Sequence, residues 1–330
     1  MLQDTQDWFG RRTFHHARFE PAASLLAAKE RAGTTISVCL PALNEAATIG
    51  EIVRVLRETL VERVPLVDEL VVMDAASTDA TARIAAAEGA TVVQEGTVLP
   101  EMGPGAGKGE GLWKSLDACS GDLICWVDTD IANIHPRFVT GLVGPLLTDP
   151  SIGYVKSFYE RPLAAGGELR PTGGGRVTEL LARPLLNAFW PALAGLVQPL
   201  SGEFAGRREL LERVPFFSGY GVELGLLLDI LKAAGVDAIA QVDLDSRVHR
   251  NQDLPSLSRM SFGVLQAALT HLADEGRLAA ASWATTYTQF ARGADGYESS
   301  DQQISITMRP PMASVAPYAR RRAAPVAGRG

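Results

Sequence analysis

Short apolar runs alternate with longer amphipathic stretches over the first half of this 330-residue chain. Strand-like and helix-like patterns that alternate in this way predict a mostly parallel sheet with helices on both faces, which is a Rossmann-like α/β fold. The uninterrupted run "LVVM" at 70–73 fits a strand buried on both faces. The pattern predicts strands over 35–42, 67–75, 91–95 and 122–128, and helices over 45–64, 77–90 and 109–119.

The second half has longer helical stretches and fewer strands. Strands are expected over 152–163 and 237–248, and helices after the Gly-rich turn at 171–176, over 219–235 and from Pro255 to about Leu278. The end, 308–330, is rich in Pro, Ala and Arg and is predicted to be partly disordered. Four parts follow: an N-terminal arm with one helix (1–33), two subdomains (34–150 and 151–255), and a helical C-terminal segment with a flexible tail (256–330).

Composition excludes several classes of protein. The net charge of −7 and the pI of about 5.4 argue against a nucleic-acid-binding protein, which needs a basic face. Three cysteines without CxxC spacing argue against a disulfide framework or a zinc site. The sequence has no apolar stretch long enough to span a membrane and no signal peptide at its start. We therefore expect a cytoplasmic protein.

Polar residues follow three of the expected strands. Asp128-Thr129-Asp130 comes directly after one of them, Asn44 and Glu45 follow the first, and Asp74 and Ser77 follow the second. Ligands of open α/β sheets bind beyond the carboxyl ends of strands, and Mg²⁺ binds one or two carboxylates together with substrate phosphates. The pattern thus indicates a metal and diphosphate site. Alternatively, Asp128 and Asp130 belong to a solvated loop, and the other residues begin or cap the following helices.

Two further segments could bind anions. Lys108 lies in the Gly-rich stretch "GPGAGKGEG", but a P-loop would need Gly at 102 and Ser or Thr at 109, where the chain has Met102 and Gly109. The alternative for Lys108 is a flexible surface lysine. "GGGRVT" (173–178) opens a helix, so its backbone N–H groups and Arg176 suit a carboxylate or phosphate. The alternative there is a helix-start turn with a solvated arginine.

The segments "LPALNEAATIG" (40–50), "DAASTDAT" (74–81) and "VDTD" (127–130) together resemble the nucleotide-sugar half of GT-A glycosyltransferases. "GKGEGLWKSL", "VKSFYERPL", "TGGGRVTELLARPLL", "PFFSGYGVELGLLLD", "DAIAQVDLDSRVHRN" and "RPPM" follow in order. This order is similar to the glucosyl-3-phosphoglycerate synthases, the retaining GT81 family, and to their mannosyl-using relatives. The resemblance covers about residues 34–260 and the short "RPPM".

The resemblance implies a role for each matching residue. It implies Mg²⁺ or Mn²⁺ bound by Asp130 and His249, and a catalytic set of Asp130, Glu223 and His249, with Glu223 orienting the sugar. It also implies a homodimer formed through the C-terminal helical part. The implied donor site consists of Pro41, Ala42, Leu43, Asn44, Glu45, Ser77 beside the uracil, Lys108, Asp128, Thr129, Leu200 and Glu223, and the implied acceptor site of Gly175, Arg176, Thr178, Arg247 and Asn251.

The implied reaction transfers glucose from UDP-glucose to the 2-hydroxyl of 3-phosphoglycerate with retention, by front-face attack. The product, glucosyl-3-phosphoglycerate, is a precursor of glucosylglycerate or of methylglucose polysaccharides. One alternative is a mannosyl-3-phosphoglycerate synthase that uses GDP-mannose, or the same acceptor with GDP-glucose. A sugar nucleotidyltransferase would need a Gly-rich, basic signature after the first strand, where this chain has "PALNEAATIG". A non-catalytic sugar-nucleotide binder is the third alternative.

Overall fold

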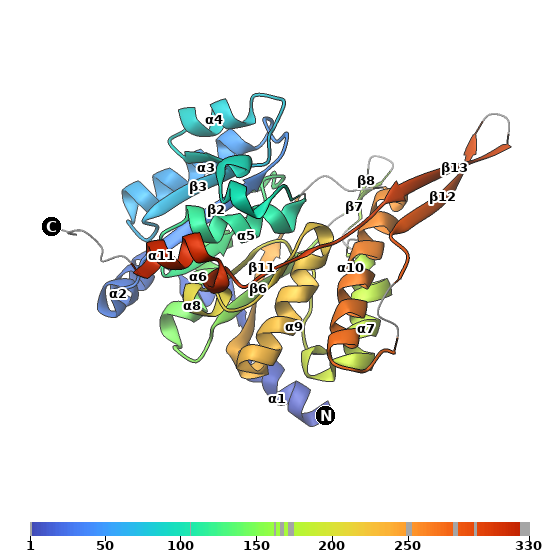
Figure 1. Cartoon of the computed structure of the whole chain (residues 1–330). Helices are drawn as coiled ribbons and strands as arrows, with labels where there is room; N and C mark the ends of the chain where they lie inside the picture. The colour runs from blue at the N-terminus through green and yellow to red at the C-terminus, as the bar shows by residue number, and fades with distance from the viewer. Residues whose placement is uncertain are drawn as a thin grey trace.

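The computed structural model describes residues 2–105, 107–161, 163–165, 168–170, 175–248, 253–279, 283–293 and 296–323. Its centre is an eight-stranded sheet of order β1-β11-β6-β9-β5-β2-β3-β4, in which β9 alone runs antiparallel to its neighbours (Figure 1). The α/β prediction is therefore confirmed. The strands are β1 (Thr13–His15), β2 (Ile36–Ala42), β3 (Glu69–Asp74), β4 (Thr91–Gln94), β5 (Leu123–Trp126), β6 (Tyr154–Glu160), β9 (Phe204–Arg207) and β11 (Ile239–Ser246).

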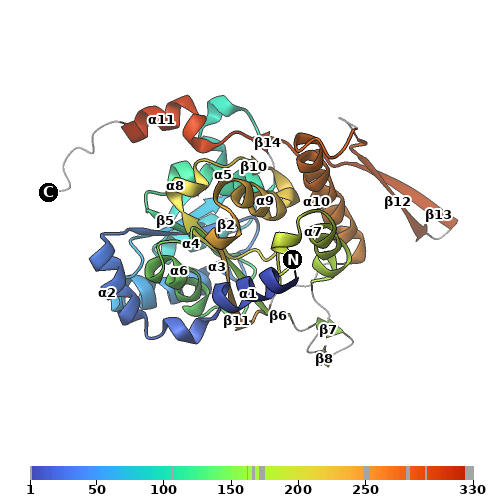
Figure 2. The same ribbon diagram turned by 90° about the horizontal axis from the view of Figure 1, so that it is seen from below.

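Helices cover both faces of the sheet, as the apolar strands predict (Figures 1 and 2). In β2, Cys39 faces one hydrophobic cluster while Val38 and Leu40 face the other, because neighbouring side chains of a strand point to opposite faces. The Val38 face packs against α2 (Ala22–Ala32), α3 (Ile49–Leu56) with its π-helical continuation Arg57–Arg63, α4 (Thr81–Ala87) and α6 (Arg137–Thr148). The Cys39 face packs against α1 (Leu2–Arg12), α5 (Lys108–Ala118), α7 (Arg183–Phe189), α8 (Arg208–Leu211), α9 (Val222–Ala234), α10 (Leu254–Asp274) and α11 (Ala316–Ala323).

The N-terminal arm differs from the single helix expected over 1–33. It forms two helices, α1 and α2, joined by β1 and the 3-10 helix η1 (His16–Phe19), and β1 extends the sheet by pairing with β11. Trp8 is buried, and its indole Nε1 donates to the carbonyl of Val236 at 3.0 Å. The polar composition of the arm conceals this anchoring because a few large apolar side chains supply the contact.

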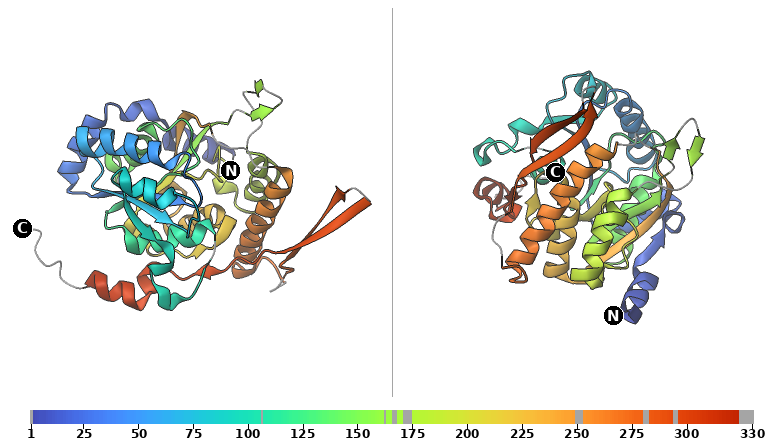
Figure 3. Two further views of the ribbon diagram at one scale, coloured as in Figure 1. Left: turned by 90° about the horizontal axis from the view of Figure 1, so that it is seen from above. Right: turned by 90° about the vertical axis from the view of Figure 1, so that its right-hand side faces the viewer.

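The C-terminal part is helical over α10, close to the expected bounds. A polar hairpin that the pattern did not predict, β12 (Thr286–Gly293) with β13 (Gly296–Gln303), projects from the body beside α10 (Figure 3). Within the end that was predicted to be partly disordered, residues 308–323 form β14 (Met308–Arg309), the 3-10 helix Met312–Ser314 and α11. Met312, Val315 and Tyr318 are buried in the main core, which explains their order despite the Pro/Arg-rich composition.

Several short elements have no apolar periodicity and escaped the sequence analysis. The most consequential is β9, which lies between β5 and β6 and so joins the two halves of the sheet. The predicted subdomains 34–150 and 151–255 therefore share one continuous sheet, and their boundaries stay a prediction. Among the described residues, no helix is long and apolar enough to cross a membrane. The remaining strands are β7 (Leu163–Ala165) with β8 (Glu168–Arg170), and β10 (Phe216–Phe217) with β14.

Candidate active site

A cavity of about 650 Å³ opens where the parallel strands β2, β3 and β5 end. Its wall includes the loops after these strands, the start of α5, the start of α9, the turn before α7 and one side of α10. The carboxyl ends of parallel strands meet at one edge of a sheet, so side chains from distant parts of the sequence converge there. Fourteen of the predicted site residues line this cavity: Pro41, Ala42, Leu43, Glu45, Lys108, Asp128, Thr129, Asp130, Gly175, Arg176, Thr178, Leu200, Glu223 and Arg247.

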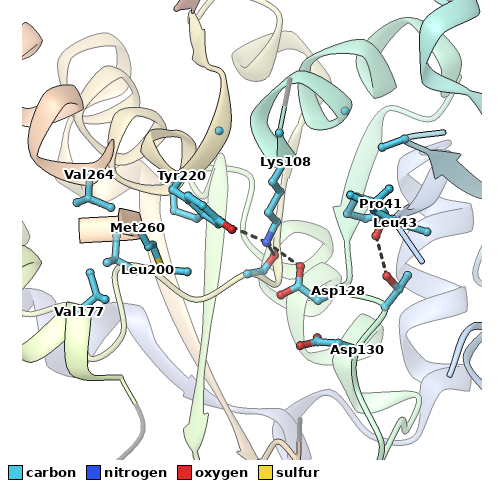
Figure 4. A pocket seen from close by; sticks show the side chains of 18 of the residues that line it. Pro41, Leu43, Lys108, Asp128, Asp130, Val177, Leu200, Tyr220, Met260 and Val264 are labelled. Carbon is cyan, nitrogen blue, oxygen red and sulfur yellow. Dashed lines mark hydrogen bonds and ion pairs between the residues drawn. The ribbon is translucent and has the colours of Figure 1, made fainter. Parts of the chain in front are cut away.

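Asp128 is the centre of a charged cluster on the cavity wall (Figure 4). Its Oδ1 lies 2.6 Å from Lys108 Nζ and its Oδ2 lies 3.1 Å from Arg247 Nη2. Lys108 Nζ also lies 3.1 Å from Glu223 Oε1. Burial would raise the pKa of Asp128, but the Lys108 ammonium and the Arg247 guanidinium outweigh it and hold that pKa well below its usual range. Lys108 is therefore an ion-paired residue of the site and no loose surface lysine.

Asp130 has a less compensated environment. Its Oδ1 accepts a hydrogen bond of 2.5 Å from Arg247 Nη2, and its side chain stays 33% exposed toward the cavity. Burial raises the pKa of the Asp130 carboxyl, and Arg247 offsets only part of this effect. A carboxylate that lacks full charge compensation and faces a cavity fits a divalent cation with oxygen ligands. The second predicted ligand, His249, lies outside the described residues, as does Asn251.

Glu203 was not among the predicted residues, although it fixes the position of Arg247. It has no exposed surface, lies 3.0 Å from Arg247 Nε through Oε1, and accepts a hydrogen bond of 2.5 Å from the Tyr159 hydroxyl. Arg247 is thereby held between Glu203 on one side and Asp128 and Asp130 on the other. The surrounding segment, "LSGEFAGR" (200–207), has no regular apolar pattern, so no signal in the sequence would have found Glu203.

Arg161 is a second residue that the sequence analysis missed. It lines the cavity and donates to the Tyr159 hydroxyl at 3.1 Å. It follows β6, so the rule that polar residues after a strand belong to the ligand site would have found it.

The middle residue of the Asp-Thr-Asp motif connects it to the loop after β2. The Thr129 hydroxyl donates to the carbonyl of Pro41 at 2.8 Å, and the Thr48 hydroxyl donates to the carbonyl of Thr129 at 2.6 Å. Thr129 is almost fully buried. The hydroxyl and the carbonyl of Thr129 therefore fix the position of the motif, and its two carboxylates contact the charged groups of Lys108 and Arg247.

Asn44 and Ser77 do not line the cavity, in contrast to the other donor residues. The Ser77 hydroxyl accepts from the Asn44 N–H at 2.9 Å, and Asn44 Oδ1 accepts from the Thr78 N–H at 2.8 Å. Asn44 adopts a left-handed conformation with φ of 57°, which asparagine tolerates better than most residues. The two residues join the β2–α3 and β3–α4 loops, and the predicted contact between Ser77 and a uracil stays a prediction.

The predicted acceptor turn lies on the same cavity. Gly175 has φ of 78°, and its carbonyl accepts from the Glu179 N–H at 3.0 Å, so it begins the helical segment that leads into α7. Arg176 and Thr178 follow on the cavity wall. A left-handed glycine that opens a helix beside an arginine fits an anion, as the sequence pattern predicts.

The opposite wall is apolar, and part of it comes from α10, which the sequence analysis did not assign to the site. Figure 4 shows Val177, Leu200, Met260 and Val264 pointing toward one another across from the charged cluster. Met260 and Val264 belong to α10. An apolar wall facing a few charged groups is typical of small-molecule sites.

A separate cluster of His15, His16 and Asp245 lies beside the end of β11, with its ligand-type atoms within 4.8 Å of one another. The Ala17 N–H donates to His15 Nδ1 at 3.2 Å, so the neutral ring carries its proton on Nε2, which faces Asp245 Oδ1 at 3.0 Å. His16 lies between Glu20 and Asp245, at 3.0 and 2.6 Å. These hydrogen bonds account for the cluster as an anchor between the N-terminal arm and β11.

Comparison with known proteins agrees with this geometry. Residues 37–214 match glycosyl transferase family 2. The glucosyl-3-phosphoglycerate synthase of Petrotoga mobilis is 52% identical over 268 residues, which is 81% of this chain and 82% of that protein.

Two solved structures have similar folds. The mannosyl-3-phosphoglycerate synthase of Rubrobacter xylanophilus has a TM-score of 0.87 at 39% identity, covering 94% of this chain and 98% of that one. The Mycobacterium tuberculosis glucosyl-3-phosphoglycerate synthase in complex with Mn²⁺, uridine diphosphate and glucosyl-3-phosphoglycerate has a TM-score of 0.76 at 48% identity, covering 87% of this chain and 93% of that one. This chain therefore belongs to glycosyl transferase family 2 and to the family of the glucosyl-3-phosphoglycerate synthases.

Proposed function

We propose that this protein transfers glucose from UDP-glucose to the 2-hydroxyl of 3-phosphoglycerate, with retention of configuration and with Mg²⁺ or Mn²⁺ as cofactor. The observation that carries the proposal is that the Asp128–Asp130 pair and the Gly175–Thr178 turn line one cavity. A metal-diphosphate site and an anion site are thus close enough for donor and acceptor to meet. The Mycobacterium tuberculosis relative, solved with Mn²⁺, UDP-glucose and phosphoglyceric acid, supports the same pair of substrates.

On the donor side, the chain offers one carboxylate toward the metal and two cations toward the diphosphate. One of these cations, Arg247, was expected in the acceptor site, but its guanidinium lies against Asp128 and Asp130. Asp130 would hold the ion together with the predicted ligand His249, and the ion would supply positive charge for the leaving diphosphate. Lys108 and Arg247 are held in place by Asp128, so they are preorganised to stabilise negative charge that develops beside them. Asp128 in this view positions the cations.

On the acceptor side, 3-phosphoglycerate presents a phosphate and a carboxylate. Guanidinium groups match both because their planar fork forms paired hydrogen bonds. Arg176 and Arg161 line the cavity near the Gly175 turn, and Thr178 adds a hydroxyl. A dianionic or trianionic acceptor is therefore favoured over a neutral alcohol.

Glu223 suits an orienting role better than that of a general base. Its carboxylate is paired with Lys108 at 3.1 Å and is nearly buried. A carboxylate that an ammonium group holds in one position is a well-oriented hydrogen-bond acceptor for a sugar hydroxyl. This agrees with front-face attack, in which the leaving phosphate assists removal of the acceptor proton.

GDP-mannose is the second candidate donor. The observation in its favour is the TM-score of 0.87 to the mannosyl-3-phosphoglycerate synthase of Rubrobacter xylanophilus, over 94% of this chain. The cytoplasmic location and the homodimer stay predictions from the sequence.

The decisive experiment offers UDP-, GDP- and ADP-sugars with and without 3-phosphoglycerate, in the presence of Mg²⁺, and follows release of the nucleoside diphosphate. We expect release with UDP-glucose and 3-phosphoglycerate together. Release with GDP-mannose in its place would move the protein to the mannosyl branch. The absence of release with every pair would refute the proposed reaction.

Three variants test the metal site and the acceptor site separately. Asp130→Asn should abolish metal-dependent turnover, and Arg176→Met should raise the KM for 3-phosphoglycerate by about 10- to 100-fold, which corresponds to about 1.4 to 3 kcal/mol. Arg183→Met is the matched control, because Arg183 lies on the same helical segment but is absent from the cavity wall and pairs with Glu179 at 2.8 Å. Equal effects of the two arginine substitutions would contradict the acceptor assignment.

A further inference from the structure

The short strand β14 returns to the donor side of the cavity from near the end of the chain. It pairs antiparallel with β10, so that Arg309 is the partner of Phe216. Arg309 Nε lies 2.7 Å from Glu110 Oε2, and its Nη2 lies 2.9 Å from Glu110 Oε1. Glu110 has no exposed surface and belongs to the first turn of α5. The pair is therefore a buried, two-point ion pair, the strongest kind of arginine–carboxylate contact.

The same guanidinium also binds the chain that precedes α5. Arg309 Nη1 donates to the carbonyl of Met102 at 2.7 Å, and Nη2 donates to the carbonyl of Gly103 at 3.1 Å. Lys108 lies between these carbonyls and Glu110 in the sequence. The Arg309 side chain thus holds both ends of the Gly-rich loop that carries Lys108. The proposed mechanism gives Arg309 no other role.

Thr307, two residues before Arg309, holds the loop that leads to Glu223. The Ser218 N–H donates to the carbonyl of Thr307 at 2.8 Å, and the Thr307 N–H donates to the Ser218 hydroxyl at 2.9 Å. Ser218 directly precedes the turn that leads to Glu223. A Cβ atom on Gly107 would lie 2.8 Å from the Cα of Gly219, so the two loops pack backbone against backbone.

We propose that Arg309 is a positioning residue for the donor nucleotide-sugar. Together with Thr307, which directly precedes β14, it joins the loop that presents Lys108 to the loop that presents Glu223. The charged groups of Lys108 and Glu223 lie 3.1 Å apart in the cavity. The inference rests on the proposed function for the identity of the donor. It gives a role to the "RPPM" motif, to which the sequence analysis assigned none.

Arginine is needed here because its fork reaches a carboxylate and two carbonyls at once. A lysine would still neutralise Glu110, but its single ammonium group cannot reproduce that planar arrangement. Arg309→Lys should therefore leave the protein folded and loosen the 102–108 loop. Glu110→Gln, which keeps the shape and removes the charge, should act in the same direction.

Arg208→Lys is the matched control. Arg208 is buried and also binds backbone carbonyls, those of Leu116, Cys119 and Gly121 at 2.6 to 2.8 Å, but neither it nor these partners line the cavity. Its substitution should lower Tm without changing the KM of either substrate.

The test combines kinetics with hydrogen exchange. For Arg309→Lys, we expect the KM for the nucleotide-sugar to rise about tenfold, the KM for 3-phosphoglycerate to stay within about twofold, and amides over 102–110 to exchange faster in the free protein. If Arg309→Lys and Glu110→Gln lower Tm but leave donor KM and exchange over 102–110 unchanged, the positioning role is wrong.

The two proposals can fail separately. If wild-type protein turned over no donor, the proposed function would be refuted, and the positioning role would be judged by exchange and by binding of UDP with Mg²⁺. Unchanged exchange and unchanged UDP binding in both variants would overturn it in that case as well.

Discussion

Lys156 provides the sharpest test of the electrostatic reasoning. It lies in β6 with no exposed surface, its ammonium donates to the carbonyl of Ser201 at 2.5 Å, and it lies 4.5 Å from the centre of the Phe204 ring. Burial lowers the pKa of Lys156 from 10.5 to about 7, and the attraction of Glu223 offsets only part of this effect. The folded protein thus holds the proton on Lys156 much less tightly than the unfolded chain does.

The sign of the pH dependence follows from this difference. Between pH 7 and 10.5 the unfolded chain binds the proton and the folded protein does not, so the free energy of unfolding rises with pH by up to about 1.4 kcal/mol per pH unit. Below pH 7 both states are protonated, and the folded state carries the whole cost of the buried ammonium. The two pKa values correspond to a cost on the order of 5 kcal/mol.

Lys156→Met removes the charge while keeping a long side chain. Urea unfolding at pH 6, 7, 8, 9 and 10 should show the variant to be the more stable protein at pH 6, with an advantage that falls steadily above pH 7. The lost hydrogen bond to Ser201 subtracts about 1 kcal/mol at every pH. A difference between variant and wild type that is the same at pH 6 and pH 10 would refute the reasoning.

Lys232→Met is the control for this experiment. Lys232 is exposed on α9, so its substitution should change the free energy of unfolding by the same small amount at each pH. Any pH-dependent difference in the control would mean that the titration of Lys156 alone does not explain the result.

Three further predictions concern two residues of the site, Thr129 and Glu203, and the separate anchor at Asp245. Thr129→Val removes the hydroxyl that binds a β2 carbonyl and should lower the free energy of unfolding by about 1–2 kcal/mol in urea; an unchanged midpoint would contradict this. Glu203→Gln leaves Arg247 without its buried counter-charge, so the guanidinium is free to turn away. Binding of UDP with Mg²⁺, measured by calorimetry, should therefore become weaker. Unaltered affinity would show that Asp128 and Asp130 alone hold Arg247 in place. The hydrogen bond from His16 lowers the pKa of the Asp245 carboxyl, so its stabilising contribution is present above about pH 4 and is lost as pH falls further. Asp245→Asn keeps a residue type that tolerates the φ of 63° at this position, so it should be less stable than wild type at pH 7 and converge with it in acid. A difference that is constant with pH would count against the anchor.

The sequence by itself determined most strands of the main sheet and the charged strand ends, and its resemblance to a known family gave most of the site. Buried strands need continuous apolar residues, so "LVVM" and "ICW" mark strand cores without knowledge of their neighbours. Because parallel strands end at one edge, Asp128 and Asp130 could be assigned to the ligand side from their position after a strand. The same reasoning reached Glu45, whereas Lys108 was assigned to the donor site by the family resemblance, and all four residues line the cavity.

Only the tertiary structure decided which residues support that site. Glu203 follows no regular pattern and becomes important only because β9 inserts antiparallel between β5 and β6 and brings it under Arg247. Asn44 and Ser77 have the residue types of ligand-binding groups, yet they bind one another's loops. Arg309 lies 199 residues from Glu110 in the chain. The local pattern of apolar residues shows which face of a helix or strand is buried. A contact between polar residues that are distant in the sequence depends instead on how the elements pack. In the unfolded chain each such residue forms its hydrogen bonds with water, and only the fold replaces the water with a particular partner.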